Sequence, residues 1–88
     1  MSAEASPAEK PDRGVVWKRL GEPTEQVGSV NDPRSQEEHG VKWNEKWIYR
    51  DPEEAGYDRL VLWYRYDLRG IFRVHPDGSV EAEPFAEA

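Results

Sequence analysis

The chain has 88 residues, enough for one small domain, and its lack of cysteine excludes disulfides, thiol nucleophiles and thiolate metal sites. The net charge of −6 belongs to the two ends, because residues 13–75 carry equal numbers of basic and acidic side chains. Binding to nucleic acid through charge alone needs an excess of Lys and Arg, so this composition counts against it.

Aromatic residues are concentrated in one part of the chain. Only 36% of all residues are hydrophobic, yet eight of the ten aromatic residues lie between residues 43 and 72. Large aromatic side chains bury much apolar area each, so this cluster predicts a folded core built from few residues.

The sequence shows no membrane or export signal. No apolar run reaches the ~20 residues of a membrane span, and the first twelve residues lack the basic and apolar parts of a secretory signal. We therefore expect a cytoplasmic protein without membrane contact.

The N-terminal part is predicted to contain a tail and two strands. Residues 1–12 are mostly Ala, Ser, Glu and Pro and cannot repay the entropy of ordering, which predicts a disordered acidic tail. Residues 13–20 (RGVVWKRL) are rich in β-branched and aromatic residues and precede a turn, which predicts a first strand. A weaker strand is predicted over residues 24–30.

The middle of the chain is predicted as a loop followed by a half-buried strand. Residues 31–40 are polar, which predicts a loop, with one helical turn over residues 33–38. Residues 41–50 then show near-alternation of apolar and polar side chains, which indicates a strand with one polar face. The predicted inner face carries Val41, Trp43, Glu45, Trp47 and Tyr49.

The C-terminal part is predicted to hold the central strand and two turns. Residues 58–67 carry apolar side chains on both faces, which predicts a strand in the middle of the sheet. An Asp-x-x-Gly pattern predicts a turn over residues 66–70. The sequence HPDG at residues 75–78 predicts the turn of a hairpin between residues 70–75 and 79–83.

Together these elements predict a mainly β fold. Its domain is a small antiparallel meander of five or six strands over residues 13–83, between the tail of residues 1–12 and a C-terminal tail of residues 84–88. Such a sheet would protect its edge strands by closing into a small barrel or by packing against a partner.

The segment Tyr64-Arg-Tyr-Asp-Leu-Arg-Gly70, followed by Asp77-Gly78, resembles one unit of the YD repeats found in large bacterial shell proteins. That family has many tandem copies and usually a basic residue directly after the glycine, where this chain has Ile71. Any tight Asp-x-x-Gly hairpin has the same pattern, so no function is carried over.

The residues that could carry catalysis do not form a recognisable set. His39 and His75 are the only histidines, and a metal site needs three or four ligands of compatible geometry. The serines lie in polar or turn segments, and the glycines are scattered singly, which argues against a hydrolytic triad and a phosphate-binding loop. We predict that the chain is not an enzyme and uses no metal or cofactor.

Aromatic and basic residues lie side by side along residues 42–50 and 59–65. Exposed Trp and Tyr next to Arg are enriched at protein interfaces, so this pattern predicts a binding face. Its candidate members are Trp43, Trp47, Tyr49, Trp63 and Tyr64, with Lys42, Lys46, Arg50 and Arg65. The alternative is that the aromatic residues fill the core while the basic residues form the solvated face.

Two functions fit such a face. The first is a protein-interaction module or accessory subunit of a larger assembly, which binds a protein partner or a further copy of the chain. The second is a small β-barrel that stacks the bases of single-stranded nucleic acid on Trp47, Tyr49 or Tyr64. The neutral central part and the acidic ends make the second the less favoured hypothesis.

Overall fold

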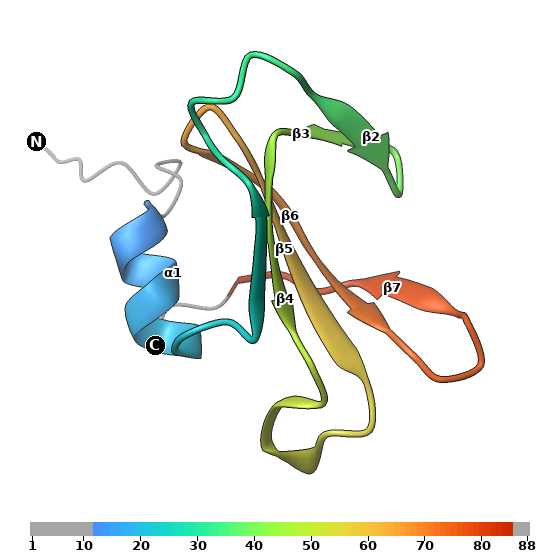
Figure 1. Cartoon of the computed structure of the whole chain (residues 1–88). Helices are drawn as coiled ribbons and strands as arrows, with labels where there is room; N and C mark the ends of the chain where they lie inside the picture. The colour runs from blue at the N-terminus through green and yellow to red at the C-terminus, as the bar shows by residue number, and fades with distance from the viewer. Residues whose placement is uncertain (1–11, 86–88) are drawn as a thin grey trace, which may run out of the picture.

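The computed structural model describes residues 12–85 and has the mainly β architecture predicted from the sequence (Figure 1). In chain order the elements are α1 (Arg13–Leu20), β1 (Glu25–Gly28), β2 (Gln36–Glu38), β3 (Val41–Trp43), β4 (Glu45–Tyr49), the 3-10 turn η1 (Pro52–Glu54), β5 (Asp58–Tyr64), β6 (Asp67–Val74) and β7 (Val80–Ala82). The tail predicted over residues 1–12 lies outside the described residues except for Asp12.

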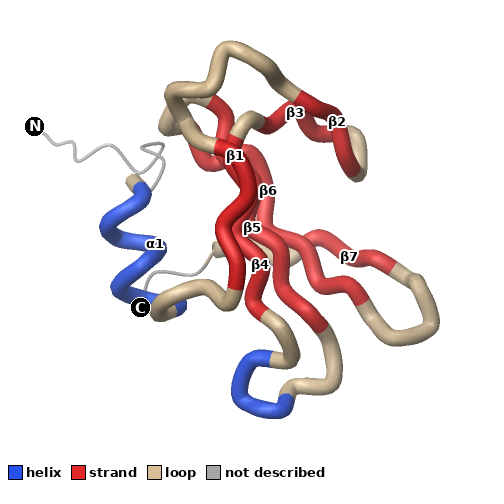
Figure 2. The backbone as a smooth tube through the Cα atoms, viewed as in Figure 1, coloured by secondary structure: helices blue, strands red, loops and turns tan. Residues whose placement is uncertain are grey.

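Five strands form one antiparallel sheet in the order β1-β4-β5-β6-β7. Strands β4 to β7 follow one another as a meander. Strand β1 also pairs with β4, although a separate hairpin, β2–β3, lies between the two in the sequence. The outer strands β1 and β7 do not pair with each other in the described chain, so the sheet is open and not a closed barrel. Figure 2 shows α1 on one side of this sheet and the β2–β3 hairpin on the other.

The main core lies between α1 and one face of the sheet. Trp47 and Tyr49 of β4 lie beside Val61 and Trp63 of β5. The other members of this cluster are Val16, Val30 and Ile71, and Leu20, Leu68 and Phe85 pack against it. Phe85 belongs to the segment predicted as a C-terminal tail, and its side chain packs against the core. Strand β5 is central and buried on both faces, as predicted.

Residues 13–20 form helix α1, so the strand predicted there is wrong. The carboxylate of Asp12 accepts a hydrogen bond from the N–H of Val15 at 2.8 Å and caps the helix. Gly21 ends the helix with φ at 88°, a conformation that favours glycine. Packing outweighs the β propensity of this segment, because the helix buries Val16 completely against the sheet.

The strand predicted over residues 41–50 is divided at Asn44 into β3 and β4. The Nδ2 of Asn44 donates to the carbonyl oxygens of Val30 and Asp32, both at 3.1 Å. These bonds hold the chain at a bend, so that β3 pairs with β2 while β4 pairs with β1 and β5. The helical turn predicted over residues 33–38 is also wrong, because that segment contains β2.

One of the two predicted turns is confirmed and the other is misplaced. At the HPDG sequence the N–H of Gly78 donates to the carbonyl oxygen of His75 at 2.9 Å, which closes the β6–β7 hairpin. The turn predicted over residues 66–70 instead consists of Arg65 and Tyr66, with φ at 53° and 75°. A two-residue turn with positive φ normally selects Asn and Gly, so the sequence carries no local signal for this one.

Candidate interaction surface

The structure divides the predicted binding face between the interior and the surface. Four of its five aromatic residues are buried: Trp43 is 3% exposed, Trp47 1%, Tyr49 4% and Trp63 0%. These four residues fill the interior, which is the alternative that the sequence analysis left open. Tyr64, at the end of β5, is the predicted aromatic residue that stays half-buried.

Two of the predicted basic residues are held in ion pairs. The Nζ of Lys46 lies 2.9 Å from Oε1 of Glu38. The guanidinium of Arg50 lies 3.1 Å from the carboxylates of both Asp58 and Glu25. Hydrogen bonds to Asp58 and Glu25 raise the pKa of Arg50 above its ordinary value. The charges of Lys46 and Arg50 are therefore neutralised locally.

Lys42, Tyr64 and Arg65 form a separate group, here named the tyrosine–cation cluster. The Nζ of Lys42 lies 5.1 Å from the centre of the Tyr64 ring, and the Cζ of Arg65 lies 5.6 Å from it. Both distances are within reach of a cation–π interaction. The ion pairs within residues 12–85 involve neither of these two cations. The cluster therefore presents two positive charges beside an aromatic ring.

The two cations also act on the hydroxyl group of Tyr64. A hydrogen bond from Arg65 and the positive charge of Lys42 lower the pKa of Tyr64 from its ordinary value of 10.0. Both cations therefore place positive charge near this hydroxyl group. Two cations and a hydroxyl donor on one surface suit a negatively charged oxygen, such as that of a carboxylate or a phosphate.

The turn between β5 and β6 sets the position of Arg65. The backbone N–H of Arg65 donates to Oδ1 of Asn44 at 3.2 Å, and the hydroxyl of Tyr66 lies 3.3 Å from Oδ1 of Asn31. Left-handed backbone conformations at residues other than glycine cost about 1 kcal/mol or more and are concentrated at binding and catalytic segments. Tyr66 is 56% exposed in this turn, directly beside the cluster.

Asn44 is a positioning residue that the sequence analysis missed. Its buried side chain bonds two carbonyl groups of the loop before β2 and also the N–H of Arg65. It thereby joins that loop to the turn that carries the cluster. The signal in the sequence is an asparagine inside an alternating strand pattern, where short polar side chains are disfavoured.

Glu45 is a second buried polar residue, and it lies inside as the strand alternation predicted. It is 3% exposed, and its Oε2 accepts hydrogen bonds from Nη2 of Arg13 and Nε1 of Trp47, both at 2.8 Å. The bond to Arg13 connects α1 to the sheet. Alternation alone placed Glu45 on the inner face without identifying its partners.

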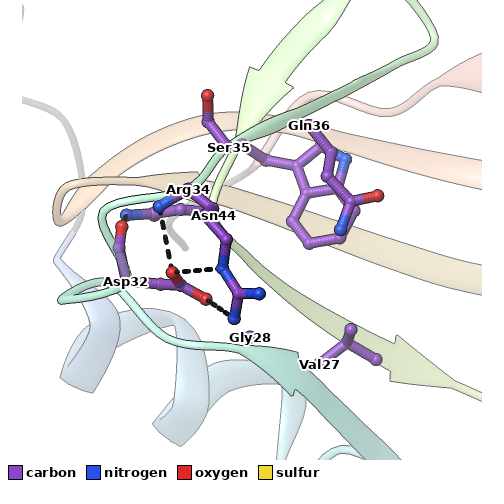
Figure 3. Close-up of a pocket in the computed structure, with 8 residues that line it drawn as sticks. Val27, Gly28, Asp32, Arg34, Ser35, Gln36 and Asn44 are labelled. Atoms are coloured by element: carbon purple, nitrogen blue, oxygen red, sulfur yellow. Dashed lines mark hydrogen bonds and ion pairs between the residues drawn. The ribbon is translucent and has the colours of Figure 1, made fainter.

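A hollow of about 490 Å³ lies between the edge of β1 and the loop that leads to β2 (Figure 3). Its lining residues are Val27, Gly28, Asp32, Arg34, Ser35, Gln36, Trp43 and Asn44. The side chains of Asp32 and Arg34 point toward each other in Figure 3 and form an ion pair at 3.2 Å. Asp32 and Arg34 neutralise each other, and Trp43 is buried. The hollow therefore presents neither a net charge nor an exposed ring, whereas the tyrosine–cation cluster presents both.

The described residues contain neither a cluster of metal-ligating side chains nor a membrane-spanning helix. No group of three or more His, Asp or Glu side chains within residues 12–85 is placed to hold a metal ion. No helix described there is long and apolar enough to cross a membrane.

Comparisons of the chain with protein-family models, with curated proteins and with solved structures find no match. The local resemblance of residues 64–70 to a YD repeat therefore has no support beyond those residues. Any proposal about function must therefore be argued from the surface of the chain itself.

Proposed function

We propose that the chain is a protein-interaction module that docks an acidic segment of a partner protein on the tyrosine–cation cluster. One observation carries the proposal: Lys42 and Arg65 flank the half-buried ring of Tyr64 without a carboxylate partner among the described residues. Tyr and Arg are the residue types that contribute most to protein interfaces, and unneutralised charges steer association with a surface of opposite sign.

The distribution of charge favours a protein partner over nucleic acid. Residues 13–75 have no net charge, so they offer no excess of cations to replace the counterions along a phosphate backbone. Two cations suit one or two carboxylates, whereas a single-strand groove needs a line of cations along several nucleotides. Single-stranded nucleic acid is the second candidate, because the exposed ring of Tyr66 beside Tyr64 offers a surface on which a base can stack.

The test compares two anionic probes of equal length, a hexaglutamate peptide and a six-nucleotide oligothymidylate. Each is titrated into the isotope-labelled chain, and the backbone NMR signals report where it binds. We expect hexaglutamate to shift the signals of Lys42, Tyr64 and Arg65 until saturation. Because exposed charges are screened by salt, its affinity should fall as ionic strength rises.

Three single substitutions separate the cluster from general electrostatics. Lys42→Ala and Arg65→Ala should each weaken hexaglutamate binding by about tenfold, the effect of one charge-assisted hydrogen bond. Lys18→Ala is the matched control, because it removes the same charge from α1, on the other side of the sheet. Equal affinity of all three variants would contradict the proposal. Tighter binding of oligothymidylate than of hexaglutamate would support the nucleic-acid alternative.

A further inference from the structure

A buried carboxylate and the indole ring of Trp47 contact the guanidinium of Arg13 where α1 meets the sheet. Nη2 of Arg13 lies 2.8 Å from Oε2 of Glu45, and Cζ of Arg13 lies 5.5 Å from the centre of the Trp47 ring. The ring of Trp17 meets that of Trp47 edge-on, with 5.4 Å between the ring centres. We name Glu45, Trp47 and Trp17 the guanidinium box.

Hydrogen bonding in the guanidinium box is incomplete. Oε1 of Glu45 is buried and has no hydrogen-bond donor among residues 12–85, and Nε of Arg13 and Nε1 of Trp63 are buried there without an acceptor. Trp63 stands directly opposite Glu45 in the β4–β5 pairing, so the two side chains leave the sheet on the same face. A buried carboxylate oxygen that lacks a donor is unfavourable, so the box has room for a second hydrogen bond that Arg13 does not make.

The side chain of Arg13 lies at the exposed edge of the box. Arg13 is the first residue of α1, and its side chain is 35% exposed, against 4% for Glu45. A hollow of about 230 Å³ lies beside it and is lined by Arg13, Gly14, Trp17 and Trp47. Rotation of the side chain into solvent leaves α1 anchored by Val16, which is fully buried.

We propose that the guanidinium box is a recognition site for an arginine side chain of a partner protein, and that Arg13 occupies the site when the partner is absent. An arginine that enters through the hollow stacks on Trp47 and donates two parallel hydrogen bonds to the two oxygens of Glu45. The ammonium group of lysine has no planar fork, and an anion is repelled by the carboxylate. The site is separate from the tyrosine–cation cluster and does not depend on it.

The first test removes the intramolecular occupant. In Arg13→Ala the carboxylate of Glu45 loses its cation, and N-acetylarginine amide is added as the probe while thermal unfolding is followed by circular dichroism. At about ten times its Kd the probe should raise the Tm of this variant by about 6 to 11 °C. The rise should be smaller for the unchanged chain, because Arg13 competes with the probe.

Two controls make the thermal test specific. N-acetyllysine amide should raise the Tm of Arg13→Ala clearly less than the arginine probe, because it cannot make the forked contact. The double variant Arg13→Ala, Glu45→Gln should lose the response to N-acetylarginine amide. A Tm of Arg13→Ala that stays constant up to about 50 mM probe, weaker than any millimolar site, would overturn the proposal.

A second measurement uses the unchanged chain and so does not depend on the folding of a variant. The indole N–H signals of the tryptophan residues are followed by NMR during titration with N-acetylarginine amide. The signals of Trp47 and Trp63 should shift until saturation, because Nε1 of Trp47 donates to Glu45 and Trp63 lies opposite Glu45 in the sheet. Trp43 is the internal control, since it lies in β3 outside the main core cluster. Equal shifts of all indole signals, or equal shifts with N-acetyllysine amide, would refute the proposal.

Discussion

Replacement of Asn44 by alanine should destabilise the fold strongly, because three backbone groups lose their partner at once. The carbonyl of Val30 belongs to a residue that is 5% exposed, and a buried acceptor left without a donor costs about 1 to 3 kcal/mol. The carbonyl of Asp32 and the N–H of Arg65 lie nearer to water, and each lost bond costs about 0.5 to 1.5 kcal/mol. The expected loss of unfolding free energy is thus about 2 to 6 kcal/mol.

Urea denaturation, followed by tryptophan fluorescence, measures this loss as a shift of the midpoint at constant m-value. Small domains are stable by only about 5 to 15 kcal/mol, so Asn44→Ala should lose a large fraction of the stability. Asn44→Asp is the informative companion variant. Its carboxylate still accepts from Arg65 but faces the carbonyl oxygens of Val30 and Asp32, so at neutral pH it should be less stable than Asn44→Ala.

A loss below about 1 kcal/mol for Asn44→Ala would refute the reasoning, because it would mean that water replaces all three bonds. The NMR signals of the alanine variant provide a second check. Since Asn44 joins the loop before β2 to the turn at Arg65, the largest shifts outside the site of substitution should occur in these two segments.

Three further changes have expected outcomes. Burial raises the pKa of Tyr49 to about 12, although the charge of Arg59 acts in the opposite direction. The protonated hydroxyl of Tyr49 therefore stabilises the fold fully below pH 10, and this stabilisation should be lost as pH rises through 12. Alkaline titration of unfolding free energy should show a fall of about 2 kcal/mol over that range, absent in Tyr49→Phe. Gly28→Ala should lose more than about 2 kcal/mol in urea denaturation, since φ is +77° and the new Cβ would lie 2.3 Å from the Asn44 carbonyl oxygen; an unchanged midpoint would exclude that clash. Arg65→Gly should raise the unfolding free energy by about 0.5 to 1 kcal/mol, because glycine adopts the positive φ of this position without strain, while hexaglutamate binding weakens. A lower unfolding free energy would show that the turn is unstrained.

The part of the fold that could be predicted from the sequence is the part specified by local patterns. Strand β5 shows apolar side chains on both faces, and the HPDG turn combines Pro and Gly at the positions that a tight turn requires. Helix α1 could not be predicted from propensity, because Val15 and Val16 favour strands. The cap at Asp12 and the glycine at position 21 were available as signals, but burial of Val16 against a distant sheet decides the outcome.

The candidate site was predicted only as a set of residue types. Tyr64, Lys42 and Arg65 were among the proposed members, but no local pattern distinguishes Tyr64 from the buried Trp63 beside it. Which of two neighbours in a central strand is buried depends on the layers on each side of the sheet, here α1 and the β2–β3 hairpin. The pairing of Glu45 with Arg13 could not be predicted either, because Arg13 lies 32 residues away in the sequence.

Folding should proceed from the C-terminal meander toward the N-terminus. Strands β4 to β7 pair with their neighbours in the chain, whereas β1 reaches β4 only across the inserted hairpin, and closing longer loops costs more entropy. We expect the amides of β5 to exchange with solvent most slowly, and those of α1 and β1 to exchange through a local opening that leaves the meander intact. The N-terminal layer would then be a late and separately reversible unit, whose opening can be altered by mutation without changing the stability of the meander.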